Sequence, residues 1–325
     1  MTILPALLVA GLALAAAPDS LLPAPDTPAA SRDTLPFRLR AMAMAAGPAE
    51  GRGRLLEPAG VAADDFGRIH VTDAALHRLQ RYDEGGVWLG EAGSLGSGAG
   101  EMRRPGAVAV LGTLSIAVLD RENRRVLSYD LFDRLQGTLI DFDDAALRDE
   151  LGRVDALDLA ADRGGGVYVA DAESDRLLAF DSSGRYLRTL GGFGARPGSF
   201  RGLRGLAVER RGDLVTAERV NARVQRLDPG GRVLAWWPIP ARPGRGALPV
   251  AVDDSGHVAV GDEAAGTLRV FDSSGHALAM LSGLRGPRAL AFTRDGSLLV
   301  AEAAAGTVRR FALEVNPEDP GRPGE

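Results

Sequence analysis

The fold is decided by the stretch LDLAADRGGGVYVADAESDRLLAFDSSGRYLRTLGGF, residues 157–193. It contains four short runs of apolar, β-branched and aromatic residues, and clusters of Gly, Asp and Ser separate these runs. This pattern is typical of four β-strands joined by tight turns. A four-stranded unit of this size cannot bury both of its faces alone, so it predicts further copies that pack against it.

The chain contains five further copies of this unit. In each copy an acidic residue ends the second run, and these residues are Asp73, Asp120, Asp171, Glu218, Asp262 and Glu302, spaced 40 to 51 residues apart. An Arg follows five residues later in four copies, and a Gly lies six residues earlier in five. Repeats of about 40 to 50 residues with four strands each are the sequence signature of propeller blades. The sequence therefore predicts an all-β fold, a six-bladed β-propeller of four-stranded antiparallel blades.

The repeat resembles the NHL-repeat family of six-bladed propellers. Blades of that family carry a Gly-apolar-apolar-Asp run, a polar loop ending in Arg, and an aromatic-Asp-x-x-Gly turn. Residues 167–184, VYVADAESDRLLAFDSSG, match this pattern most completely, and the resemblance extends over residues 37–313. It implies an exported bacterial-type member of the family. Such propellers serve as binding modules, lyases and lactonases alike, so the resemblance is specific for fold and not for function.

The two ends of the repeat region predict how the ring closes. Residues 37–45 have the pattern of a fourth strand with no first three strands before it, whereas residues 287–313 supply three strands and no fourth. The amino-terminal strand is therefore expected to complete the last blade, which removes exposed sheet edges. The predicted propeller spans residues 36–315. Residues 316–325, rich in Pro and Gly, are expected to form a disordered tail.

The amino terminus predicts export. Residues 3–17 form an uninterrupted apolar run that is short for a membrane span and ends in three alanines. This pattern is typical of a signal peptide, predicted at residues 1–17, and residues 18–35 read as a disordered Pro-rich linker. Because no Lys or Arg precedes the run, an uncleaved anchor remains an alternative. We expect a periplasmic or extracellular protein with no stable membrane span after processing.

Composition excludes several classes of function. The 325 residues contain no Cys, which excludes disulfides, thiol catalysis and thiolate metal sites. All 38 basic residues are Arg, yet the net charge is only −5, and aromatic residues make up 5% of the chain. Nucleic-acid binding usually brings a strongly basic surface or stacking aromatics, so no nucleic-acid partner is expected. We expect one folded domain and a monomer.

The sequence lacks the residue patterns of an enzyme. Its four histidines, His70, His77, His257 and His276, occupy different parts of the repeat, whereas a zinc site needs three converging protein ligands. The resemblance implies such a central zinc site only for related amidating lyases. No nucleophile elbow, phosphate loop or zinc-protease motif occurs. We therefore expect no catalytic residue, no metal and no cofactor, and keep a metal-dependent lyase or lactonase and an RNA-binding module as alternatives.

The repeated carboxylates are predicted to be structural. In a six-membered ring neighbouring carboxylates at this position would lie ~10 Å apart, too far to share a calcium ion, whose oxygen ligands lie ~2.4 Å away. The Arg five residues later begins the adjacent antiparallel strand, so each carboxylate has a local partner for a charge-assisted hydrogen bond. The predicted structural pairs are Asp73–Arg78, Asp120–Arg125, Asp171–Arg176 and Glu218–Arg223.

Loop charges predict the binding face. If the strands of a blade are called a to d from the axis outward, the a–b and c–d turns are mostly acidic, and the d–a loops between blades carry Arg on the opposite face. Loops on a rigid scaffold are where partners are recognised, and the Arg guanidinium pairs with carboxylate or phosphate. Because Arg is this chain's only strong cation, solvated loops without a partner are an equal alternative. The candidate ligand-binding residues are Arg103, Arg104, Arg153, Arg201, Arg204, Arg242, Arg245, Arg285 and Arg288.

These observations favour an exported, non-catalytic binding scaffold. Its expected partner is a protein segment or an anionic ligand bound through the Arg-rich d–a loops. The longest of these loops, residues 141–153, allows either a short helix capped by Asp143 or Asp144 or an irregular surface excursion.

Overall fold

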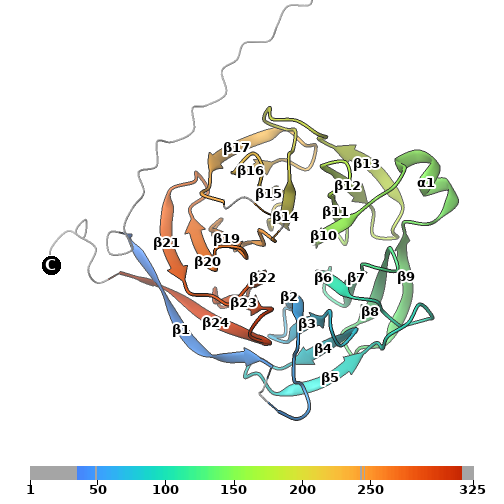
Figure 1. Cartoon of the computed structure of the whole chain (residues 1–325), viewed down its shortest axis with the longest axis horizontal. Helices are drawn as coiled ribbons and strands as arrows, with labels where there is room; N and C mark the ends of the chain where they lie inside the picture. The colour runs from blue at the N-terminus through green and yellow to red at the C-terminus, as the bar shows by residue number, and fades with distance from the viewer. Residues whose placement is uncertain (1–34, 48–49, 242–243, 245, 317–325) are drawn as a thin grey trace, which may run out of the picture.

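The computed structural model describes residues 35–47, 50–241, 244 and 246–316. Within them, six four-stranded antiparallel sheets surround a central axis, as the view down that axis shows (Figure 1). The predicted six-bladed propeller is therefore confirmed. The predicted signal peptide, almost all of the predicted linker and all but the first residue of the predicted tail lie outside the described residues. In the described part of the chain, no helix is long and apolar enough to cross a membrane.

The first three blades run in chain order from the innermost strand to the outermost. Blade 1 contains β2 (Pro58–Ala63), β3 (Ile69–Asp73), β4 (Arg78–Tyr82) and β5 (Trp88–Ala92). Blade 2 contains β6 (Pro105–Leu111), β7 (Ser115–Asp120), β8 (Arg125–Asp130) and β9 (Leu135–Asp141). Blade 3 contains β10 (Ala156–Ala161), β11 (Val167–Asp171), β12 (Arg176–Phe180) and β13 (Tyr186–Leu190).

The last three blades follow the same plan until the chain ends. Blade 4 contains β14 (Leu203–Val208), β15 (Leu214–Glu218), β16 (Arg223–Leu227) and β17 (Val233–Pro238). Blade 5 contains β18 (Val250–Val252), β19 (Val258–Asp262), β20 (Thr267–Phe271) and β21 (Ala277–Ser282). Blade 6 contains β22 (Pro287–Phe292), β23 (Leu298–Glu302) and β24 (Thr307–Val315), with β1 (Phe37–Ala46) as its outermost strand.

Closure of the ring by the amino-terminal strand is confirmed. Strand β1 pairs antiparallel with β24, from Phe37 opposite Val315 to Ala46 opposite Val308. Beyond this ladder, the backbone amide of the buried Asn316 donates to the Pro36 carbonyl over 2.8 Å. Asn316, the first residue of the predicted tail, therefore packs on the propeller.

The core lies between the blades. Successive residues of a strand point to opposite faces of its sheet, and each sheet packs against a neighbouring blade on both faces. The second strand of every blade except blade 2 is therefore buried at all five of its residues, and in β7 only the first of six residues is less than buried. Trp237 fills one such space completely and contacts Phe271, with ring centroids 6.0 Å apart.

A short helix lies between blades 2 and 3, in the longest loop. Helix α1 (Ala145–Leu151) begins after Asp144, whose side chain accepts a hydrogen bond from the Leu147 amide over 3.0 Å. Gly152, with a φ of 69°, ends it. Leu151 is buried in the core between blades 2 and 3, so the carboxyl end of the helix packs on the propeller.

Candidate ligand-binding site

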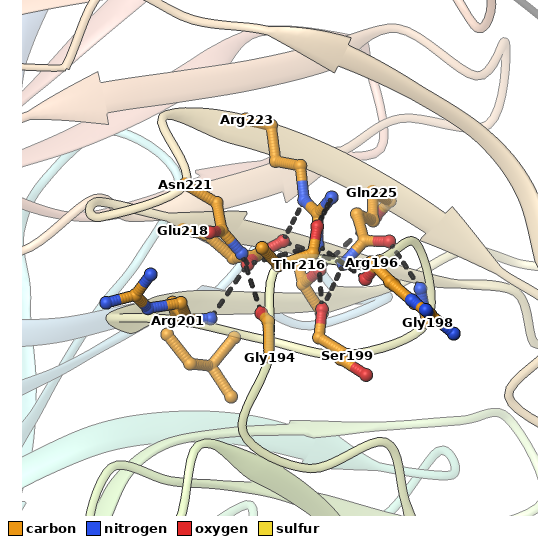
Figure 2. Close-up of polar contacts among 12 residues, drawn as sticks. Gly194, Arg196, Gly198, Ser199, Arg201, Thr216, Glu218, Asn221, Arg223 and Gln225 are labelled. Carbon is orange, nitrogen blue, oxygen red and sulfur yellow. Dashed lines mark hydrogen bonds and ion pairs between the residues drawn. The ribbon is translucent and has the colours of Figure 1, made fainter.

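The repeated carboxylates at the ends of the second strands anchor the d–a loops. In blade 4, Glu218 is completely buried and accepts hydrogen bonds from the Arg201 amide over 2.9 Å, from Arg223 Nε over 2.7 Å and from Gln225 Nε2 over 2.7 Å (Figure 2). Asn221 donates to the same carboxylate. One acidic side chain thus gathers the loop that enters the blade and the strand that follows it.

Arg223 and Gln225 extend this network to the backbone of the d–a loop. Arg223 donates to the carbonyl oxygens of Arg196 and Ser199 over 3.0 and 2.8 Å (Figure 2). It also donates to the Ala195 carbonyl over 2.8 Å. Gln225 Nε2 also donates to the Ser199 carbonyl, over 2.9 Å. Glu218 holds Arg223 and Gln225, and these two side chains fix the loop backbone. The acid therefore positions the d–a loop as well as joining two strand ends, which was its only predicted role.

The other blades show which of the predicted pairs form. Arg125 contacts Asp120 and Arg176 contacts Asp171, each over 2.8 Å, and both carboxylates are completely buried. Blade 1 differs from the prediction. Arg78 pairs with Glu91, over 2.7 Å, rather than with Asp73. The carboxylate of Asp73 is occupied by backbone amides instead, those of residues 56, 57, 75 and 76.

A cavity of about 620 Å³ lies on the propeller axis. Its wall is built from the innermost strands, and its mouth from residues that precede those strands or follow the second strands. It therefore opens on the face where the d–a loops emerge, hereafter the d–a face. Six arginines line it, namely Arg104, Arg121, Arg124, Arg153, Arg204 and Arg288. Five acidic residues do so as well, namely Glu57, Glu122, Asp155, Asp158 and Glu263.

The structure brings four of the nine candidate arginines together at this cavity: Arg104, Arg153, Arg204 and Arg288. The remaining candidates lie elsewhere or outside the described residues. Arg103 contacts Glu122, a cavity residue, over 3.7 Å. Arg201 packs over the exposed ring of Phe193, 5.2 Å from its centroid. Arg285 is exposed and uses its backbone amide to contact Glu302. Arg242 and Arg245 are not among the described residues.

One side of the cavity mouth is electrically neutralised. Glu57 lies between Arg104, 2.8 Å away, and Arg288, 2.6 Å away, and Arg288 also contacts Glu263 over 2.8 Å. Burial opposes ionisation of Glu57, but the hydrogen bonds from Arg288 and Arg104 outweigh it and lower the pKa of the carboxyl group. These four side chains form one continuous chain of alternating charge, so they offer little net attraction to a charged ligand.

The opposite side of the mouth carries an excess of positive charge. Arg121 contacts Asp155 over 3.5 Å, whereas Arg153 and Arg204 have no carboxylate within ion-pair distance among the residues that the structure describes. Arg204 donates to the Leu203 carbonyl over 2.7 Å, and its half-burial lowers its pKa despite the fields of Asp175 and Asp155. We call Arg121, Arg153 and Arg204 the cationic sector. It draws its members from blades 2, 3 and 4.

Sequence reasoning missed the carboxylates of the cavity and the arginines of the b–c loops, Arg121 and Arg124. A signal for the axial residues exists in the repeat itself. Fourteen residues before the strand-end carboxylate, Arg stands only at 204 and 288, and the other copies have Ala, Gly or Leu. Thirteen residues before it, Asp158 stands where the other copies have Gly, Ala or Pro. When the six copies are aligned, a charged residue at a position that is small or apolar in the other copies is thus a candidate for a function specific to one blade.

The opposite face is less acidic than the turn sequences suggest. The turn aspartates Asp181, Asp228 and Asp272 each accept hydrogen bonds from backbone amides of their own turns. Each also contacts a basic side chain four residues later, as Asp181 contacts Arg185 over 3.0 Å. Hydrogen bonds from Ser183 and the Arg185 amide hold the pKa of Asp181 far below its usual range. These aspartates therefore shape turns, and their charge is largely compensated locally.

The four histidines lie in separate places. His70 is completely buried beside Asp64, with 3.1 Å between its Nε2 and the carboxylate, and His77 Nδ1 accepts a hydrogen bond from the Arg104 amide. His257 and His276 contact the aspartates of their own turns. No group of three His, Asp or Glu side chains that could hold a metal ion occurs among the described residues.

No protein-family model matches the sequence, and no curated protein sequence matches it. Several solved structures have a fold similar to that of this chain. Virginiamycin B lyase from Staphylococcus aureus has a TM-score of 0.62 and 9% identity, covering 85% of this chain and 99% of that chain. A gluconolactonase from Xanthomonas campestris has a TM-score of 0.59 and 15% identity, covering 90% and 98%. A protein of unknown function from Bacteroides thetaiotaomicron has a TM-score of 0.60 and 14% identity, covering 85% and 76%. This likeness is one of fold.

The chain therefore shares its six-bladed architecture with lyases and lactonases. At such low identity no residue role can be carried over, because one fold supports many unrelated functions. The residues of the axial cavity are the ones that bear on the function.

Proposed function

We propose that this protein is an exported, NHL-type propeller that acts as a non-catalytic binding scaffold. It recognises an anionic group, carried by a small molecule or a protein segment, at the cationic sector of the axial cavity. The observation that carries the proposal is the position of Arg153 and Arg204 at the mouth of a cavity of about 620 Å³, without ion-pair partners among the described residues.

Guanidinium groups that lack an ion pair and lie in a concave site favour anions for two reasons. A guanidinium presents several N–H donors in a planar fork that matches the oxygens of a carboxylate or phosphate. In a cleft with low-dielectric walls, its field is also less screened than at an open surface. The paired arginines on the other side, Arg104 and Arg288, are already satisfied by Glu57 and Glu263 and serve to hold the mouth in shape.

The proposal is tested by replacing Arg153 and Arg204. We expect the double variant Arg153→Ser/Arg204→Ser to bind an N-acetylated triglutamate peptide at least ten-fold more weakly than the unmodified protein, as measured by calorimetry. Binding to the unmodified protein should weaken as salt rises, because the Debye length falls to ~8 Å at physiological ionic strength. Equal binding by the double variant and the unmodified protein would contradict the proposal.

A matched control is available on the other face. Arg185 and Arg232 are more than three-quarters exposed and lie in c–d turns of blades 3 and 4. The double variant Arg185→Ser/Arg232→Ser removes the same charge from the same two blades. It should bind the peptide like the unmodified protein, and a loss as large as that of the first variant would mean that only the overall charge matters.

A further inference from the structure

Asp158 lies within the wall of the axial cavity at a position that is otherwise reserved for small residues. It sits on β10 at the bulge of the innermost strand, opposite Ala170, the residue before the strand-end carboxylate. The same register position holds Gly60 in blade 1, Gly205 in blade 4 and Ala289 in blade 6. At Gly60 an added Cβ would lie 2.5 Å from the Gly106 carbonyl, so the neighbouring inner strand approaches closely there. Blade 3 alone places a carboxylate at this level of the axis.

The carboxylate of Asp158 is held in place, but no cation compensates it. Its Oδ2 accepts a hydrogen bond from the Leu206 amide of blade 4, and its Oδ1 accepts one from the Leu159 amide, each over 2.9 Å. Two backbone amides use about half of the acceptor positions of a carboxylate. In the described part of the chain Asp158 has no ion pair, and burial raises its pKa to about 7. The group therefore retains acceptor positions that the protein does not use, and Asp158 is among the residues that line the cavity.

The carboxylate and the cationic sector lie at different depths. Asp155 is at the mouth, near enough to Arg204 for its charge to act on that guanidinium. Asp158 follows three residues later as the third residue of β10, just after the bulge, whereas Asp155 precedes that strand. At ~3.3 Å per residue, this places it roughly 10 Å deeper along the axis. The wall near that depth includes the small or apolar residues Gly106, Ala107 and Leu157, and the backbones of Arg204 and Arg288 stand at the same repeat position as Gly106 and Leu157.

We propose that the axial cavity binds an amphoteric ligand, whose ammonium group contacts Asp158 and whose carboxylate contacts Arg153 and Arg204. This inference rests on the proposed function and deepens it, because it names the chemistry of both ends of the ligand. The small residues around the carboxylate favour an unbranched amine. An extended tripeptide with free ends has the matching span, since three residues cover roughly 10 Å.

The charged groups around the cavity agree with this orientation. The other ionisable side chains that line it include Glu57, Arg104 and Arg288, which are paired with one another, and Asp155, which is paired with Arg121. None of them contributes to the ionisation of Asp158, whose neighbours on β10 and β14 are backbone amides. An ammonium group at that depth would therefore meet a carboxylate that has no competing cation from the protein.

The test compares triglycine with N-acetyltriglycine, in which an acetyl group replaces the charged ammonium by a neutral amide, and Asp158→Asn separates the loss of charge from the added bulk. At pH 7.5 we expect triglycine to bind at least ten-fold more tightly to the unmodified protein, and Asp158→Asn to reduce its affinity to that of the acetylated peptide. The Asn side chain keeps an oxygen that can accept the Leu206 amide, and thermal unfolding verifies that the variant is folded. At pH 5.5, where Asp158 is largely protonated, the preference for the free amine should shrink severalfold.

The outcomes show whether the amphoteric-ligand proposal fails alone or together with the proposed anion site. If both peptides bind equally to the unmodified protein but require Arg153 and Arg204, the amphoteric ligand is excluded and the anion site stands. If neither triglycine nor the acetylated triglutamate depends on these arginines, both proposals are wrong. A longer peptide that begins with three glycines followed by a glutamate separates the two sources of such a ligand. Binding as tight as that of triglycine points to the amino terminus of a protein, and binding only of triglycine points to a small molecule.

Discussion

At the scale of single residues, the same repeat position carries different energetic weight in different blades. Arg223 is almost completely buried, contacts Glu218 over 2.7 Å and donates to three carbonyl groups of the d–a loop. Arg78 occupies the equivalent position in blade 1 but is about one quarter exposed and pairs with Glu91, itself 40% exposed. The sequence presents the two arginines alike, and only their surroundings distinguish them.

This difference predicts unequal costs of truncation. We expect Arg223→Ala to lower the free energy of unfolding by about 3 kcal/mol, because a buried carboxylate loses its charged partner. The matched change Arg78→Ala should cost less than ~1 kcal/mol, as for other solvent-exposed pairs. Urea unfolding of the two variants measures both values. Equal costs would contradict the prediction that the buried pair in blade 4 contributes more than the exposed pair in blade 1.

Asp158 predicts a pH dependence of stability. Burial raises its pKa from 3.8 to about 7, so between these values the folded protein holds a proton that the unfolded chain has released. Stability contributed by this group is therefore present at low pH and lost as pH rises through about 7. Asp158→Asn lacks this loss, so its free energy of unfolding relative to the unmodified protein should rise by about 3 kcal/mol between pH 4.5 and 8. Urea midpoints at the two pH values test this, and a constant difference would contradict it.

At the scale of elements, the strand that closes the ring carries a prediction of its own. Residues Ala45 and Ala46 of β1 are buried in the core between blades 6 and 1, and Phe37 and Leu39 pack against the core between blades 5 and 6. Deleting residues 1–34 leaves these contacts in place and should not change the melting temperature. Deleting residues 1–46 uncovers both cores and the edge of β24, so we expect a fall of more than about 10 °C or aggregation. Calorimetry decides between these outcomes, and equal melting temperatures would mean that β1 adds no stability.

The strands could be predicted from sequence because their signals are local. Alternating apolar residues and Gly-containing turns mark each strand of residues 157–193, and the repeated acid sets the phase from blade to blade. The exchange of partners in blade 1 could not be predicted. Glu91 lies on β5, which pairs with β4, so its contact with Arg78 depends on the register of this hairpin and on an acid at a position that the repeat pattern does not include.

At the scale of the whole molecule, the site depends on how six blades meet. The sequence identified Arg104, Arg153, Arg204 and Arg288 as members of a basic face, but not their convergence on one cavity. It also could not show that Glu57, from blade 1, neutralises Arg288, from blade 6, since 231 positions separate them in the chain. Net charge at a propeller axis is set by contacts between blades, whereas the repeat pattern describes each blade alone.

The pairing of β1 with β24 also orders events in time. Phe37 and Val315 are neighbours in the sheet, yet nearly the whole chain must be made before they can meet. Until then β1 has no partner for its backbone groups, and blade 6 has no outer strand to complete it. Synthesis proceeds from the amino terminus, so β1 is made before every other strand, yet it can pair only after β24 has been made. During that interval Ala45 and Ala46, which are buried in the finished ring, remain uncovered together with the edge of β24.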